Sequence, residues 1–151
     1  MPSRRDTLKH SATVAALLAS AGFFSKGVMA YDKAAFNAQT VGEAVKALGG
    51  AAPVESKDVS ITGPDIAENG AIVPLSLSTT LPNVKRLLLL VDKNPSALVA
   101  MFNISPDIEA NFSTRAKLAQ SCDVYAVAIT TDGKAFFAKK DVKVTLGGCG
   151  G

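Results

Sequence analysis

The chain has 151 residues, with 16 basic and 13 acidic side chains, two cysteines, one histidine and no tryptophan. This length suits one domain with a hydrophobic core of its own. The only histidine, His10, lies in an amino-terminal segment that the sequence predicts to be removed. The mature chain then lacks the histidine of Ser-His-Asp sites, Cys-His sites and histidine-ligated metal centres, so we expect no catalytic site of those kinds and no metal.

Residues 1–30 have the three parts of a twin-arginine signal peptide. Arg4 and Arg5 open the segment, an apolar run follows over residues 12–24, and Val28-Met29-Ala30 supplies the small residues that precede a cleavage site. The apolar run is too short to cross a bilayer comfortably, so we expect no membrane anchor. The predicted mature chain starts at Tyr31 and is exported, already folded, to the periplasm.

Removing the leader changes the charge of the chain. Residues 31–151 keep 12 of the 16 basic and 12 of the 13 acidic residues, and this neutral balance gives no support for nucleic-acid binding. The sequence has no Rossmann glycine pattern, P-loop, haem motif or iron–sulfur cysteine set, so we expect no cofactor. Export in the folded state then favours a partner subunit that travels with the chain.

Residues 31–55 are predicted to form an amino-terminal helical segment. Thr40 and Glu43 have the spacing of a capping box, and Gly49-Gly50 provides a helix stop. We expect one short helix that packs on the domain or on a partner.

Residues 56–146 alternate between apolar and polar positions, with turn residues every eight to twelve positions. The sequence predicts strands over residues 58–62, 71–78, 84–91, 97–104, 111–118, 124–130 and 134–146. Turn signals separate them; examples are Glu68-Asn69-Gly70, Asn94-Pro95 and Asp132-Gly133, which fits a tight hairpin. Short strands without intervening helices predict an all-β fold, an immunoglobulin-like antiparallel β-sandwich.

The run Val84–Val91 is unusually apolar for a strand with one solvated face. Two interpretations remain open at this point. Either the strand is central in the sandwich, or a partner covers its second face.

Residues 147–151 form the predicted carrier arm, in which Gly147, Gly148, Gly150 and Gly151 surround Cys149. Glycines at a chain end order poorly, and five extended residues span about 17 Å. The last strand is expected to anchor the chain up to residue 146, so a thiol on a flexible arm would follow a rigid base. We identify Cys149 as the candidate site of covalent attachment.

Two further features near the arm have two interpretations each. Lys139, Lys140 and Lys143 either attract an anionic adduct on Cys149 or form a solvated edge face of the sheet that discourages strand addition, which is the commoner role. Cys122 is either an isolated strand-edge cysteine, which we favour, or a disulfide partner of Cys149. Their spacing is not that of a redox dithiol.

The sequence resembles the SoxY family, the sulfur-carrier subunits of the periplasmic Sox thiosulfate-oxidising system. The terminal residues 147–151, the stretch 139–146, Ile66–Gly70 with Val73-Pro74-Leu75, and the helix 40–50 carry the resemblance. It implies that Cys149 carries thiosulfonate and persulfide intermediates and that the chain is not itself an enzyme. It also implies a heterodimer with a SoxZ-like subunit and transient contact with the enzymes that load, hydrolyse and oxidise the carried sulfur. The family does not require Cys122.

Two alternatives to a Sox carrier come from other classes. A Gly-Gly terminus also marks ubiquitin-like sulfur carriers, which are activated at the terminal carboxylate. A plain interaction domain with a disulfide-forming terminal cysteine would also fit an exported chain.

Overall fold

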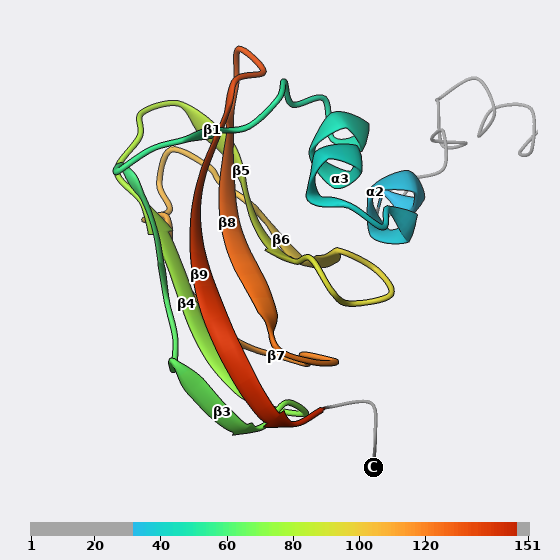
Figure 1. Cartoon of the computed structure of the whole chain (residues 1–151). Coiled ribbons are helices and arrows are strands. Elements are labelled where there is room, and N and C mark those ends of the chain that lie inside the picture. The colour runs from blue at the N-terminus through green and yellow to red at the C-terminus, as the bar shows by residue number, and fades with distance from the viewer. Residues whose placement is uncertain (1–31, 148–151) are drawn as a thin grey trace, which may run out of the picture. The chain divides into compact units, whose positions relative to one another are not determined.

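The computed structural model describes residues 32–147. The predicted leader, Tyr31, and the arm residues Gly148, Cys149, Gly150 and Gly151 lie outside the described residues. Figure 1 traces the described part from α2 to the end of β9.

Two β-sheets form the body of residues 32–147, as predicted (Figure 1). The larger sheet has the order β1-β9-β8-β5-β6, with β3 paired to β9. Its strands are β1 (Val54–Glu55), β9 (Ala135–Leu146), β8 (Cys122–Thr130), β5 (Val84–Val91), β6 (Leu98–Asn103) and β3 (Ile66–Asn69). The smaller sheet has the order β2 (Val59–Thr62), β4 (Val73–Thr79) and β7 (Asn111–Ala116). All seven predicted strands are confirmed, and the fold is an immunoglobulin-like β-sandwich.

Two strands of the larger sheet were not predicted. Neither β1 nor β3 was expected, and both run parallel to β9, so the larger sheet is not purely antiparallel. The turn predicted at Glu68-Asn69-Gly70 begins later, because β3 continues through Asn69 and the turn starts at Gly70. The Asn69 side chain accepts a hydrogen bond from the Ala71 N–H (2.8 Å), which stabilises this turn.

β5 is a central strand whose two faces pack into two different cores. Leu87, Leu89 and Val91 belong to the core between the sheets, whereas Leu88 and Leu90 belong to a second core beneath the helices. All five side chains are fully buried. The chain's own helices therefore cover the second face of β5, and the interpretation that a partner covers it is wrong.

The amino-terminal segment forms two helices, α2 (Lys33–Asn37) and α3 (Val41–Ala47), in place of the one expected. The predicted capping box is confirmed, because the Thr40 hydroxyl accepts from the Glu43 N–H and the Glu43 carboxylate accepts from the Thr40 N–H. Gly49 has φ +79°, a conformation that favours glycine, and ends the helix as predicted. Arg86 of β5 donates to the Leu48 carbonyl (3.1 Å) and so ties this helix end to the sheet.

The long strand β9 runs to one end of the sandwich, where Leu146 is its last residue (Figure 1). It follows β8 through the predicted Asp132-Gly133 turn, where Gly133 has φ +83°. β9 continues to Leu146, as expected, and spans about 40 Å at the usual rise per residue. The predicted arm therefore begins at the far end of β9 from the hairpin turn.

Candidate functional site at the base of the carboxyl-terminal arm

The candidate attachment residue, Cys149, lies outside the described residues, and so do Gly148, Gly150 and Gly151. The structure describes Gly147 and the end of the sheet that precedes it. This region, the arm base, consists of residues 143–147 and the segments that contact them.

β3 holds one side of the arm base. Lys143, Val144 and Leu146 of β9 pair with β3 in a parallel ladder. The Lys143 N–H donates to the Asp65 carbonyl (2.9 Å), and the Gly70 N–H donates to the Leu146 carbonyl (2.8 Å). The backbone of β9 is therefore hydrogen-bonded through its last residue on this side.

The loop over residues 117–121 holds the other side of the arm base. The Ser121 hydroxyl accepts from the Val144 N–H (2.9 Å). The Asn94 side chain fixes the loop itself, since it donates to the Lys117 carbonyl (2.7 Å) and accepts from the Ala119 N–H (3.0 Å). A further hydrogen bond joins the two sides of the arm base, from the Leu118 N–H to the Gly70 carbonyl (2.7 Å).

Gly147 lies against the 117–121 loop at a distance that excludes a side chain. A Cβ atom built on Gly147 would lie 2.4 Å from the Ala119 carbonyl oxygen, far closer than real Cβ contacts. Glycine is the residue that permits such a close approach between two backbones.

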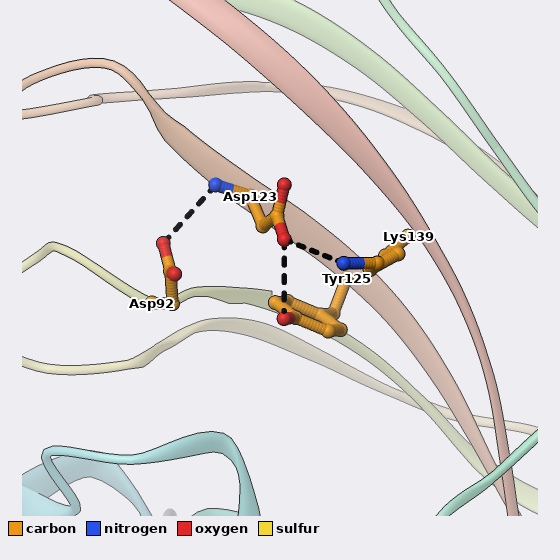
Figure 2. Close-up of polar contacts among 4 residues, drawn as sticks. All are labelled: Asp92, Asp123, Tyr125 and Lys139. Atoms are coloured by element: carbon orange, nitrogen blue, oxygen red, sulfur yellow. Dashed lines mark hydrogen bonds and ion pairs between the residues drawn. The ribbon is translucent and has the colours of Figure 1, made fainter.

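Two of the three lysines near the arm base are in ion pairs. Lys139 contacts the Asp123 carboxylate (2.9 Å), and Lys140 contacts Asp65. Figure 2 shows that Asp123 is also a junction, because its N–H donates to Asp92 (3.1 Å) and its carboxylate receives a long bond from the Tyr125 hydroxyl (3.5 Å). Among the described residues, Lys143 has no ion pair. These pairs leave little net positive charge beside the arm base, which favours the interpretation of a solvated face. The expectation of an edge strand is wrong, because β9 is paired on both sides.

The electrostatics of this group follow from Asp123. Its hydrogen bond and negative charge raise the pKa of Lys139, so the ammonium stays charged and paired at neutral pH. Burial, followed by the charge of Asp123, raises the pKa of Tyr125, so its hydroxyl stays protonated. These two protonation states preserve the bonds that Lys139 and Tyr125 donate to the Asp123 carboxylate in Figure 2.

Cys122 is the first residue of β8 and is a free, buried thiol. This position at the end of a strand agrees with the favoured interpretation, and the side chain belongs to the core between the sheets. Burial, reinforced by the charges of Asp92, Asp123 and Asp141, raises the pKa of Cys122 to about 11. Cys122 is therefore a neutral and inaccessible thiol at physiological pH, which is the opposite of a reactive cysteine.

Comparison with known proteins decides the family. The family described as sulfur oxidation protein SoxY matches residues 44–149, which include the arm base and Cys149. The chain belongs to the SoxY family. SoxY proteins are sulfur carriers and not enzymes, so the ubiquitin-like alternative is set aside.

Solved structures agree with membership of the SoxY family. The chain is similar to the sulfur carrier protein SoxY from Chlorobium limicola f thiosulfatophilum, with 33% identity and a TM-score of 0.62 over 69% of this chain and 94% of that chain. It is also similar to a superoxide reductase (neelaredoxin) from Ignicoccus hospitalis, with 19% identity and a TM-score of 0.51 over 60% of this chain and 82% of that chain. A second structure of that superoxide reductase has the same identity and TM-score over 66% of this chain and 86% of that chain. At this identity the superoxide reductases show the fold alone. No curated protein matches the chain.

Within residues 32–147, no group of three or more histidine, cysteine, aspartate or glutamate side chains is arranged to hold a metal ion. In the same range, no helix is long and apolar enough to cross a membrane.

The sequence predicts the residues of the arm but not those that hold its base. Asn94 and Gly70 were interpreted only as turn residues, and Ala119 carried no signal at all. These three residues lie far apart in the sequence, and the pairing of β5 with β8, of β4 with β7 and of β3 with β9 brings them together.

Proposed function

We propose that the chain carries sulfur-oxidation intermediates covalently on Cys149 and presents them to the enzymes of the Sox system. The observation that carries this proposal is the arm base: β9 is hydrogen-bonded through Leu146 on the β3 side and through Val144 on the other, and Cys149 follows three residues after Leu146. Membership of the SoxY family, over a range that includes Cys149, supports the same assignment.

The proposed chemistry places a sulfur–sulfur bond at Cys149. Joining a thiolate to thiosulfate forms a thiosulfonate adduct and releases two electrons, which a partner enzyme must accept. Hydrolysis of the terminal sulfonate then releases sulfate and leaves a persulfide on the cysteine. An exposed thiol needs no local base for this role, because a few per cent is already thiolate near neutral pH.

The charge around the arm base suits a carrier that releases its load. Because Lys139 and Lys140 are each paired with a carboxylate, they are not available to hold an anionic adduct. Lys143, which has no ion pair among the described residues, is then the one lysine of the three that is left to attract a thiosulfonate on Cys149.

The experiment that tests the proposal is intact-mass spectrometry after incubation with thiosulfate and the Sox enzymes. The expected result is an increase in the mass of the wild-type chain and no increase in Cys149→Ala. An unmodified wild-type chain, or a modified terminal carboxylate, would contradict the proposal.

We also propose that a SoxZ-like subunit binds the chain, and that it does so along β6. This strand is an edge of the larger sheet and pairs only with β5 among the described residues. Since the Ile104 N–H donates to the Lys85 carbonyl, the alternation of an antiparallel ladder directs the backbone groups of Met101 and Asn103 away from β5.

β6 lacks the features that normally protect an edge strand. Its six residues include no charge and no proline, whereas the edge strand β7 of the other sheet carries Arg115 and exposed polar side chains. An apolar strand with free backbone groups is suited to pair with a strand of another subunit.

Amide hydrogen exchange in the presence of a SoxZ-like subunit tests this surface. The amides of Met101 and Asn103 are expected to exchange at least about tenfold more slowly in the complex, because they gain hydrogen-bond partners. Amides of β7 serve as the control and are expected to be unchanged. Protection confined to another surface would contradict the assignment of β6.

We propose, finally, that the chain is exported to the periplasm together with this subunit. Arg4→Lys combined with Arg5→Lys should leave both subunits in the cytoplasm, as measured by immunoblotting of cell fractions. A partner subunit that still reaches the periplasm would show that it is exported on its own.

A further inference from the structure

We propose that Gly147 is a positioning residue, which sets the direction in which the chain leaves β9 toward Cys149. This inference rests on the proposed carrier function. It assigns Gly147 a role in close packing, in addition to its predicted place in the arm.

The first step is the contact itself. A Cβ atom at Gly147 would meet the Ala119 carbonyl oxygen at 2.4 Å and the Ala119 carbonyl carbon at 3.5 Å. Both atoms belong to the backbone, so no side-chain rotation relieves the clash. Either the chain at Gly147 or the loop at Ala119 would have to move.

The second step is that the loop is held more firmly than the chain end. Asn94 bonds to both Lys117 and Ala119, and Leu118 is fully buried and donates to Gly70. Gly147, by contrast, is exposed and follows the last residue of β9. A side chain at position 147 is therefore expected to displace the chain end and not the loop.

The third step concerns the backbone conformation of Gly147. The positive-φ glycines in the described part of the chain are Gly49 and Gly133, so Gly147 has a φ that alanine also adopts. The approach to Ala119, and not the left-handed region of φ, is what requires glycine here. Gly147→Ala therefore perturbs one contact and adds no backbone strain.

The consequence is a displacement at the point where the arm starts. Restoring an ordinary contact from 2.4 Å requires a movement of roughly 1 Å, and misplacement of about that size at a reacting group costs on the order of 10²-fold in rate. Because Gly147 is separated from the reacting group on Cys149 by the intervening chain, we expect a smaller loss, of about tenfold.

The activity test compares Gly147→Ala with Gly148→Ala. The second variant is the matched control, because it also replaces one glycine of the arm by alanine. In turnover of the carrier by a Sox enzyme, Gly147→Ala is expected to lower kcat/KM about tenfold and Gly148→Ala less than about threefold. The rate of Cys149 alkylation by a small reagent should be equal in both variants, because the thiol itself is unchanged. Equal kcat/KM values for the two variants would overturn the proposal.

A rescue experiment separates positioning from a general loss of structure. Asn94→Ala frees the 117–121 loop to yield, so the double variant Asn94→Ala/Gly147→Ala is expected to regain part of the kcat/KM lost in Gly147→Ala. Strictly additive losses would contradict the inference.

Amide exchange provides a readout that does not depend on carrier activity. In Gly147→Ala the Gly70 amide, which donates to Leu146, is expected to exchange faster, while the Leu118 amide keeps its protection. Faster exchange of the Leu118 amide would show that the loop yields. An unchanged exchange rate of the Gly70 amide would show that the contact is unimportant. If the wild-type chain were never loaded with sulfur, the carrier function would fail, whereas this measurement would still decide the role of Gly147.

Discussion

Cys149→Ala is expected to reduce thiosulfate-dependent turnover of a reconstituted Sox system to the level measured without the carrier. The reason is chemical, because alanine has no sulfur to which an intermediate can be attached, and a covalent carrier has no partial substitute for its attachment atom. The substitution leaves every residue of the two described cores in place. The free energy of unfolding should therefore change by less than about 0.5 kcal/mol.

The matched control is Cys122→Ala, which removes the other cysteine of the chain. Because Cys122 is buried in the core between the sheets, this variant is expected to be less stable, by roughly 1 kcal/mol, and still to carry sulfur. Turnover retained in Cys149→Ala and lost in Cys122→Ala would reverse the assignment of the attachment site.

Leu88→Ala is expected to destabilise the chain by about 2–5 kcal/mol, as measured by chemical denaturation. Leu88 is fully buried on β5, and its side chain packs in the core formed with α2 and α3. Alanine would leave a cavity between the larger sheet and these helices, which a packed core fills only in part. The expected loss is a large share of the stability of a domain of this size.

Leu146→Ala is the matched control for Leu88→Ala, because it removes the same atoms from a side chain that is 68% exposed. We expect a change within about 0.5 kcal/mol for this variant. Equal effects of the two substitutions would show that the helices do not cover β5 in solution.

The strands show which parts of the fold a local sequence pattern can predict. Alternation of apolar and polar residues, with turn residues between the runs, predicted seven of the nine strands in residues 32–147 and the Asp132-Gly133 hairpin. β1 and β3 were missed because both pair in parallel with a strand remote in the sequence, and β1 has only two residues. Such pairing leaves no local pattern.

The apolar run of β5 shows a limit of another kind. Five consecutive buried residues, Leu87–Val91, indicate that both faces of the strand are covered, but not what covers them. The structure assigns the second face to α2 and α3, because their side chains share one core with Leu88 and Leu90.

The candidate site was predicted in its chemistry and not in its support. A cysteine among terminal glycines indicates attachment through residue type alone, so Cys149 could be identified from the sequence. The contact of Gly147 with Ala119 depends on tertiary structure, since Asn94, Gly70 and the 117–121 loop are far apart in the sequence and are joined by long-range hydrogen bonds.

Peptide mass spectrometry of the loaded chain tests the central claim most directly. Trypsin cleaves after Lys117, Lys134 and Lys143, so Cys122 and Cys149 fall in the separate peptides 118–134 and 144–151. After incubation with thiosulfate and the Sox enzymes, the sulfur adduct is expected on peptide 144–151, with peptide 118–134 unmodified. An adduct on peptide 118–134, or on neither peptide, would contradict the assignment of Cys149 as the sulfur attachment site.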